Sequence, residues 1–401
     1  MPIFIFLSLG IIEIPANIFK RYLMFKARKK REKFKDLIVI GITGSYGKSS
    51  TKEFLYTMLS KKYGEDKVLK TEGNVNTEIG VANTVLKKLN NNHKFFICEM
   101  GAYKRGEIRI ACNIVMPKIG ILTGINEQHL ALFGSMENLV SAEGGLELAE
   151  NLPQNGILVL NGDNETVKLK YQVPSTKYQQ IFCSTKEKTD LWTENIKVEK
   201  DWLYFRVCDK ARENADFKIN LVGRQNIENI LLAAACAKEL GMSLSEIAKA
   251  CEKITPQQGA MRLIQSPTLA DKSRTLDVID STYSANPDGV LAALEHLKLW
   301  SSCQKVIIMP CLIELGPAAK EVHQKIGKKI GQICDFSIIT TKDWFEEIRK
   351  AAVAEGMKPE SIIFSENPQE IFEKIKPFLQ PENVILLEGR LPKELLKIVL
   401  N

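Results

Sequence analysis

The sequence lacks the cysteine pattern of a zinc site or of a disulfide framework. It has nine cysteines, an odd number, and no two of them form a CxxC pair. Disulfide-rich secreted domains and zinc knuckles are built on paired, closely spaced cysteines. Free thiols in a reducing cytosol are therefore the simpler interpretation, and we expect a cytoplasmic protein.

The sequence also lacks a long apolar run. The longest candidate near the start, "IFIFLSLGII" at residues 3–12, has ten residues, whereas a membrane-spanning helix needs about 20. It does not resemble a signal peptide, because the positive charge follows the apolar part and no small-residue cleavage site is evident.

The excess of positive over negative charge is confined to one short segment. Residues 20–35, "KRYLMFKARKKREKFK", carry nine Lys or Arg against Glu32 alone, and the chain as a whole has a net charge of +7. The body of the protein is therefore neutral, which argues against nucleic acid as a partner. Two interpretations of residues 1–35 stay open: peripheral contact with an anionic membrane at its inner face, or a packed helix with a solvated charged end.

The rest of the chain alternates short apolar runs with helical patterns, as parallel α/β domains do. Residues 37–264 form the predicted central nucleotide-binding domain with a mainly parallel sheet, which starts with the strand "LIVIGITG". Residues 265–275, "QSPTLADKSRT", form a polar linker without periodicity. Strand and helix patterns resume in residues 276–401, which we predict to be a Rossmann-like α/β domain.

The segment "IVIGITGSYGKSSTKEF", residues 38–54, predicts a phosphate-binding loop between a strand and a helix. Glycines allow close approach of the backbone to phosphate, Lys48 can reach the β and γ phosphates, and a Ser hydroxyl can hold Mg²⁺. The alternative is a turn that only joins the two elements. A standard loop of this type has glycine where this sequence has Ile42. The predicted ATP-binding residues here are Gly44, Ser45, Tyr46, Gly47, Lys48, Ser49 and Ser50.

This shortened loop, "TGSYGKSSTK", resembles that of the Mur ligases, and further segments resemble motifs of the same family in the same order. The segments are "GNVNTEIG" (73–80), "EMGAYKRGEI" (99–108), "INEQHLALFGS" (125–135), "GRQNIENILLAAA" (223–235), "MRL" (261–263), "VIDSTYSANPDG" (278–289) and "CLIELG" (311–316). The last two most resemble the MurF type, which adds D-alanyl-D-alanine.

The resemblance implies an ATP-dependent amide ligase that uses ATP and Mg²⁺ and forms an acyl phosphate. Lys48, Glu99 and His129 would be catalytic, and Ser49, Glu99 and His129 would serve at the metal sites. Asn226 and Arg262 would contact ATP from the central domain, and Asp280 and Asn286 from the C-terminal domain. The alternatives are a packed histidine at 129, a helix cap at Asn226 and loop hydrogen bonds for the others.

The sequence departs from the family pattern in three ways. The family's carbamylated lysine has no counterpart in residues 135–153; either Glu143 or Gly145 aligns with it, and we expect Glu143 to supply the metal-binding carboxylate. The residues before the first strand are too few for the uridine-nucleotide-binding domain of MurF-type enzymes. Ser284 and "LLEGRLPKE" (386–394) also differ, so the amine pocket is expected to differ.

We therefore expect a ligase that joins a small-molecule or lipid-linked cell-wall precursor to an amino acid or dipeptide such as D-alanyl-D-alanine. A folylpolyglutamate- or cyanophycin-type ligase remains an alternative. So does a nucleotide-binding homologue without catalysis, suggested by the missing lysine and the missing domain. The set of Lys48, Glu99, His129, Asn226 and Arg262 argues against loss of catalysis.

Overall fold

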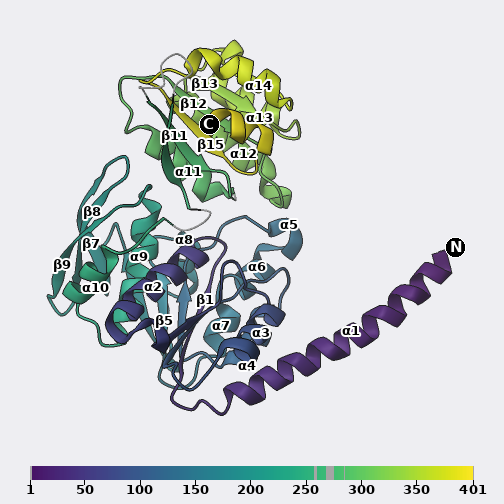
Figure 1. The fold of residues 1–401 in the computed structure, drawn as a ribbon, viewed down its shortest axis with the longest axis vertical. Coiled ribbons are helices and arrows are strands. Elements are labelled where there is room, and N and C mark those ends of the chain that lie inside the picture. Colours follow the sequence, from purple (N-terminus) through teal and green to yellow (C-terminus); the bar gives the residue numbers. More distant parts are fainter. Residues whose placement is uncertain (1, 257–259, 268–274, 284, 401) are drawn as a thin grey trace.

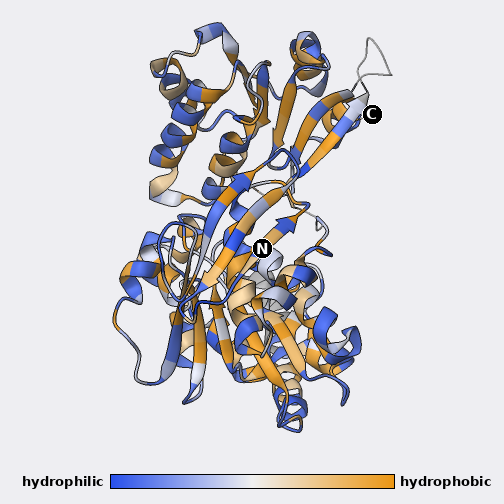
Figure 2. Cartoon of the chain, turned by 90° about the vertical axis from the view of Figure 1, so that its left-hand side faces the viewer, coloured by the Kyte–Doolittle hydropathy of each residue, from blue (hydrophilic) through white to orange (hydrophobic). Residues whose placement is uncertain are grey.

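The computed structural model describes residues 2–256, 260–267, 275–283 and 285–400, with side chains from residue 15 onward. Two α/β domains lie one above the other (Figure 1). Each domain is built on one sheet with helices on both faces. Figure 2 shows the hydrophobic strands enclosed within each domain. The predicted fold class, a mainly parallel ATP-binding domain followed by a smaller α/β domain, is confirmed.

In the residues described, the first sheet has nine strands in the order β2-β3-β1-β4-β5-β6-β7-β8-β9. Neighbours from β2 to β7 are parallel, and β7, β8 and β9 pair antiparallel. The strands are β1 (Ile38–Thr43), β2 (Val68–Lys70), β3 (Phe95–Glu99), β4 (Ile119–Leu122), β5 (Gly156–Asn161), β6 (Tyr178–Ser184), β7 (Leu191–Val198), β8 (Leu203–Asp209) and β9 (Asn214–Ile219).

Helices cover both faces of this sheet, and each face has its own core. The helices α2 (Lys48–Tyr63), α9 (Gln225–Glu239) and α10 (Leu244–Cys251) pack on one face. The other face carries the end of α1 (Pro2–Arg31) together with α3 (Glu78–Lys88), α4 (Glu107–Val115), α6 (Met136–Ala142), α7 (Leu146–Glu150) and α8 (Glu165–Lys170). The short elements η1 (Glu65–Lys67) and α5 (Leu130–Phe133) complete the domain.

Strand β1 shows why the central strands are apolar throughout. Val39 points into the core of one face, while Ile40 and Ile42 point into the other. All three are fully buried, because a strand in the middle of a doubly covered parallel sheet has no solvent side. The loop at its carboxyl end therefore starts from a rigid position at the edge of the sheet.

In the residues described, the second sheet has six strands in the order β10-β11-β15-β12-β13-β14, and only β10 is antiparallel to its neighbour. Helices α11 to α13 pack on one face, and α14 and α15 on the other. The strands are β10 (Arg262–Pro267), β11 (Thr275–Ser281), β12 (Lys305–Met309), β13 (Phe336–Ile339), β14 (Ile362–Phe364) and β15 (Val384–Glu388). The helices are α11 (Pro287–Leu297), η2 (Gly316–Ala318), α12 (Ala319–Ile333), α13 (Phe345–Ala354), η3 (Pro359–Ser361), α14 (Pro368–Ile375), η4 (Lys376–Phe378) and α15 (Lys393–Leu400).

The predicted linker, residues 265–275, overlaps regular structure at both ends. Gln265, Ser266 and Pro267 belong to β10, and Thr275 begins β11; residues 268–274 lie outside the described part. A single edge strand tolerates proline and polar residues, which is why this segment shows no strand periodicity in the sequence. Strand β10 joins the second sheet from Arg262 onward.

Helix α1 extends away from the body (Figure 1). Its C-terminal end packs against α3 and α4. Among the described residues, no helix combines the length and the apolar character needed to cross a membrane.

Candidate functional site

Two glycines shape the loop between β1 and α2. Gly44 has φ 141° and Gly47 has φ 74°, values that favour glycine. A Cβ at Gly44 would lie 2.1 Å from Oγ1 of Thr123, and one at Gly47 would lie 2.4 Å from Oδ1 of Asn229. Gly47 also leaves the first turn of α2 without a side-chain cap. The N-terminus of α2 can therefore receive an anion through its backbone N–H groups.

Tyr46 holds the middle of this loop in place. Its carbonyl accepts a hydrogen bond from Oγ1 of Thr123, and its phenol oxygen accepts one from Nδ2 of Asn164 at 3.2 Å. A Cβ on Gly124 would lie 2.3 Å from the phenol oxygen. Burial raises the pKa of the Tyr46 phenol, so it stays neutral at physiological pH. Ile42, the unusual residue in the motif, is a buried residue of β1, and the loop begins after it.

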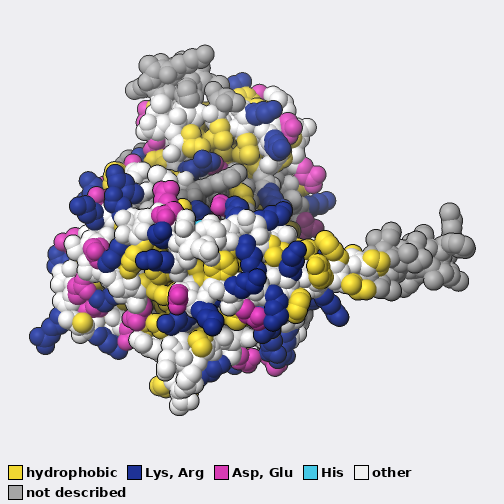
Figure 3. Space-filling model, turned by 60° about the horizontal axis from the view of Figure 1, so that its bottom comes forward, with side chains coloured by type: hydrophobic (Ala, Val, Ile, Leu, Met, Phe, Trp, Pro, Cys, Tyr) yellow, Lys and Arg dark blue, Asp and Glu magenta, His cyan; other side chains and the backbone are white. Residues whose placement is uncertain are grey.

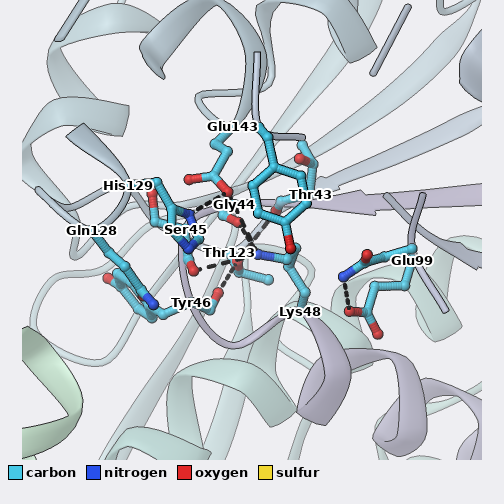
Figure 4. A network of polar contacts seen from close by, with 12 residues as sticks. Thr43, Gly44, Ser45, Tyr46, Lys48, Glu99, Thr123, Gln128, His129 and Glu143 are labelled. Atoms are coloured by element: carbon cyan, nitrogen blue, oxygen red, sulfur yellow. Dashed lines mark hydrogen bonds and ion pairs between the residues drawn. The ribbon is translucent and has the colours of Figure 1, made fainter. Parts of the chain in front are cut away.

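The ammonium of Lys48 lies over its own loop, as Figure 4 shows. Its Nζ donates to the carbonyls of Gly44 at 2.5 Å and Ser45 at 3.3 Å. The carboxylate of Glu143 is 3.9 Å away. A phosphate bound at the loop would meet this ammonium directly, because the cation already sits at the end of the helix that faces the cavity.

His129 lies between two carboxylates from different domains. Its Nδ1 is 3.1 Å from Oε1 of Glu143, and its Nε2 is 3.6 Å from Oε2 of Glu314. Glu143 is only 1% exposed. Its second oxygen, Oε2, has no hydrogen-bond partner among the residues that the structure describes. A buried carboxylate oxygen without a partner is costly, and a bound cation would satisfy it.

The two candidates for the missing lysine position are separated by the structure. Glu143 follows α6 and reaches the cluster with Lys48 and His129 (Figure 4). Gly145 has φ 78° and precedes α7, where it offers no side chain. Of the two aligned positions, Glu143 is the one that brings a carboxylate to the site.

Glu99 forms a second polar centre on the other side of Lys48. It ends β3 beside Ile42 of β1, and it is 1% exposed. Its Oε1 accepts hydrogen bonds from Oγ of Ser49 at 3.1 Å and from Nδ2 of Asn76 at 3.2 Å. Parallel strands present their carboxyl ends at one edge of the sheet, which explains why Glu99 meets the first turn of α2.

Lys52 was not predicted from the sequence to belong to the site, although it contacts Glu99 directly. Its Nζ lies 3.0 Å from Oε2 of Glu99, and it also donates to the carbonyl of Gly73 at 2.5 Å. The side chain is fully buried. Lys52 is one helical turn after Lys48, so the i, i+4 spacing could have identified it.

Two cavities meet at the loop. The larger, about 550 Å³, is lined by Tyr46, Asn226, Glu228 and Asn286, among others. The smaller, about 260 Å³, is lined by Lys48, Ser49, Glu99 and His129, among others. Tyr46, Gly47, Ser50 and Asn286 line both. The loop therefore lies between a space large enough for a nucleoside and a smaller space lined by Lys48, Glu99 and His129.

Asn226 and Asn286 line the larger cavity and also hold local structure. Nδ2 of Asn226 donates to the carbonyl of Val222 at 2.9 Å. Asn286 is the N-cap of α11, and its Oδ1 accepts from the N–H of Gly289 at 3.0 Å. Helix capping and cavity lining are thus combined in Asn286. Contact of either residue with ATP stays a prediction.

Arg262 and Asp280 are not brought to the loop. They are partners across β10 and β11, with Nη2 of Arg262 2.9 Å from Oδ2 of Asp280. Thr282 donates twice to the other oxygen of Asp280. Arg262 lines a separate cavity of about 420 Å³. Their contact with ATP stays a prediction.

Glu228 is a second residue that the sequence did not single out. It lines the larger cavity, and Nδ2 of Asn161 donates to it at 3.2 Å. Burial raises its pKa, and Asp163 raises it further. Glu228 lies between the two asparagines of "GRQNIEN". Its position inside this motif is the feature of the sequence that could have identified it.

Both domains contribute to the site and touch around it. Beside the His129–Glu314 contact, the N–H of Ala131 donates to the carbonyl of Glu314 at 3.0 Å. Nδ2 of Asn126 donates to Oδ2 of Asp288 at 2.9 Å. Farther out, Nζ of Lys200 lies 2.8 Å from Oδ2 of Asp277. The two domains therefore meet beside the loop.

Buried His323 supports the loop that carries Glu314. Its Nε2 accepts from the N–H of Leu312 at 2.9 Å, so the Nδ1 atom, 2.6 Å from the carbonyl of Ala319, is the protonated one. The ring stacks on Trp344 at 5.5 Å. Burial lowers the pKa of His323 below the usual 6.5. Neutral imidazole is thus part of the folded state.

We expect acid to destabilise the protein through this histidine. Because the pKa is lower in the folded state, the contribution is complete above about pH 6.5 and is lost as the pH falls toward the folded pKa. The free energy of unfolding, measured in urea between pH 5 and 8, should fall more steeply below pH 6.5 in the parent than in His323→Gln. Identical slopes for the two proteins would contradict the assignment.

Comparison with known proteins agrees with this arrangement of domains. Residues 42–237 match the family model described as Mur ligase middle domain, and residues 268–391 match that of the Mur ligase, glutamate ligase domain. A UDP-N-acetylmuramoyl-tripeptide--D-alanyl-D-alanine ligase from Bacillus subtilis is 28% identical over 293 residues, which cover 73% of this chain and 60% of the relative. The protein of that name from Mycobacterium tuberculosis is 30% identical over 298 residues, covering 73% and 56%. The chain thus spans about 60% of the length of such curated relatives.

Solved structures share the fold. MurF from Acinetobacter baumannii superposes with a TM-score of 0.80 at 24% identity, over 95% of this chain and 79% of that one. MurF ligase from Thermotoga maritima, in complex with ADP, gives a TM-score of 0.79 at 22% identity, over 95% and 83%. Since the two family models follow each other over most of the sequence, this chain belongs to the Mur ligase family.

Proposed function

We propose that this protein is an ATP-dependent carbon–nitrogen ligase of the MurF type. It would join a carboxylate of a cell-wall peptide precursor to the amine of D-alanyl-D-alanine or a similar amine. The observation that carries this proposal is the junction of two cavities at the glycine loop, one of nucleoside size and one lined by Lys48, Glu99 and His129. The names of the relatives support the same reaction class.

The loop residues suit phosphoryl transfer to a carboxylate. Backbone N–H groups at the start of α2 and the ammonium of Lys48 would neutralise the β and γ phosphates. A carboxylate oxygen of the acceptor then attacks the γ phosphorus, and ADP leaves. The amine nitrogen attacks the resulting acyl phosphate, inorganic phosphate leaves, and an amide bond forms. Contacts between the domains, such as Ala131 with Glu314, would exclude water from this step.

The residues present fit Mg²⁺ in two places. Ser49 and Glu99 bring a hydroxyl and a carboxylate within 3.1 Å of each other, and Glu143 offers an unpaired buried oxygen beside His129. No group of three or more His, Cys, Asp or Glu side chains with metal-binding geometry occurs in the described part of the chain. This is expected of Mg²⁺, which takes one or two carboxylates plus substrate phosphates. When bound, the cation would supply charge neutralisation of the phosphates.

We expect Glu143→Gln to raise the Mg²⁺ concentration needed for half-maximal ATP turnover about tenfold, because the amide keeps the shape but removes the negative oxygen. The measurement is a Mg²⁺ titration of ADP release. Glu137→Gln is the matched control, since Glu137 lies exposed on α6. An unchanged Mg²⁺ requirement in Glu143→Gln would remove this residue from the metal site.

One of the departures from the family pattern is a fully buried residue. Glu388 ends β15 where the family pattern has a lysine, and burial raises its pKa to about 8. Ser284, the other departure, lies outside the described residues. The amine is therefore proposed as D-alanyl-D-alanine or a similar amine.

The proposed acceptor is a small-molecule or lipid-linked precursor, and the proposed place of action is the cytoplasm, at the inner face of the membrane. A ligase of folylpolyglutamate or cyanophycin type, or a nucleotide-binding homologue without turnover, is the alternative. Incubation with ATP, Mg²⁺, a muramyl tripeptide and D-alanyl-D-alanine tests this. A product heavier by the dipeptide minus water is expected. ATP binding without ADP release under any acid and amine would favour the homologue without catalysis.

A further inference from the structure

The C-terminal part of α1 is held on the body through one side. Ala27 is fully buried. Lys30 donates through Nζ to the carbonyl of Leu86 at 2.9 Å. The guanidinium of Arg31 donates to the carbonyls of Val115 at 2.9 Å and of two residues in the turn after the helix. These contacts fix which side of the helix faces away from the protein.

The side that faces away carries large apolar residues. Ile18, Phe19, Tyr22 and Phe25 are 63%, 59%, 56% and 59% exposed. Positions 18, 22 and 25 follow a helical spacing of four and three, so they lie along one stripe, with Phe19 at its side. Figure 3 shows hydrophobic side chains and Lys or Arg side chains together where α1 leaves the body. Four exposed large apolar residues within eight positions are unusual for a surface that meets water alone.

Basic residues surround this stripe. Glu32 is the single acidic residue of residues 20–35. It pairs with Arg28 at 3.1 Å and with Lys29 at 2.9 Å. Nζ of Lys29 also lies 5.8 Å from the ring centre of Phe25. The basic side chains are therefore direct neighbours of the apolar stripe. The exposed basic residues in this segment are Lys20, Arg21, Lys26, Arg28, Lys29, Lys33 and Lys35.

We propose that α1 docks the protein on the surface of an anionic phospholipid bilayer, with Ile18, Phe19, Tyr22 and Phe25 at the boundary between headgroups and acyl chains. An amphipathic helix with aromatic and aliphatic residues beside Lys and Arg has the chemistry of an interfacial helix, and each cation near an anionic lipid surface strengthens the attachment. A second copy of the chain is disfavoured as occupant, because two such helices would bring like charges together. The inference does not depend on the proposed ligase reaction.

Co-sedimentation with vesicles tests the docking. The full chain should bind vesicles of phosphatidylcholine with phosphatidylglycerol at least about tenfold more tightly than vesicles of phosphatidylcholine alone, and salt should weaken binding. Phe19→Glu/Phe25→Glu should lower binding by about tenfold or more. Leu169→Glu/Val173→Glu is the matched control, since these residues are 66% and 73% exposed elsewhere on the body, and it should bind as the parent does.

Several results would overturn the inference: equal binding to both kinds of vesicle, no binding by the parent, or the same loss in the control as in the Phe19/Phe25 variant. A parent that is a dimer in solution, converted to a monomer by the Phe19/Phe25 variant, would assign the surface to a second copy instead. Thermal melting checks that each variant is folded. ATP turnover without vesicles should be unchanged in the Phe19/Phe25 variant, which separates docking from catalysis.

Discussion

Lys48→Ala should lower ATP turnover about 10³-fold. The ammonium lies at the N-terminal end of α2, between the loop carbonyls and Glu143, where it would meet the charge that develops during phosphoryl transfer. Removing one preorganised group of this kind from an active site costs about two to three orders of magnitude in kcat. Because Lys48 carries a full positive charge, we expect its loss to lie at the upper end of this range. ADP release under saturating ATP and Mg²⁺ measures the effect.

The control for this variant is Lys61→Ala, an exposed lysine on the same helix, which should turn over ATP like the parent. Calorimetric titration with ATP should show weaker binding in Lys48→Ala, and a melting curve should show a folded protein. If Lys48→Ala binds and consumes ATP as the parent does, the proposed function fails at its first step.

Lys52→Met should destabilise the fold by about 3 kcal/mol. Lys52 is fully buried and holds the equally buried Glu99 through an ion pair at 3.0 Å. Removing one partner leaves an uncompensated charge in a medium of low dielectric constant, and that loss typically costs about 3–5 kcal/mol. Ser49 and Asn76 still donate to Glu99, so the lower end is expected. Urea unfolding of the apo protein measures the change.

Lys62→Met provides the comparison on the same helix. Lys62 pairs with Glu246 at 2.8 Å in a partly exposed position, and such pairs contribute at most about 1 kcal/mol. The double variant Lys52→Met/Glu99→Gln should recover part of the lost stability, because the isolated charge is gone. Equal destabilisation by Lys52→Met and Lys62→Met would mean that the Glu99 pair does not hold this region together.

The sequence was sufficient for the parts of the site that follow from strand and helix order. Gly44, Gly47 and Lys48 sit where a strand gives way to a helix, and Glu99 ends a buried run, so parallel topology alone brings them to one edge. The approach of Glu143 to His129 could not be predicted in this way. It depends on how α5 and α6 turn back over the loop, and His129 itself has φ 67°, which periodicity does not encode.

The charge partners of Lys52, Arg262 and Asp280 could not be predicted from the sequence. Lys52 was not among the predicted site residues, yet it is fully buried and contacts Glu99. The i, i+4 spacing places Lys52 on the same side of α2 as Lys48. Contact of Arg262 and Asp280 with ATP stays a prediction; in the structure, the antiparallel pairing of β10 and β11 makes the two residues neighbours. Which residue each of these side chains contacts depends on elements distant in sequence, and local patterns carry no information on that.

The length of α1 sets the geometry of any attachment through it. A helix of 30 residues rises about 1.5 Å per residue, or about 45 Å in all. It rests on α3 and α4, and the loop before α3 supplies Asn74 and Asn76 to the smaller cavity. Because the helix would lie along the lipid surface, its attachment to α3 and α4 would fix which face of the body, and so of the cavity, turns toward the lipid. Inserting four residues into it would shift the body by about 6 Å and rotate it by about 40°, which would turn the cavity mouth relative to whatever the membrane presents.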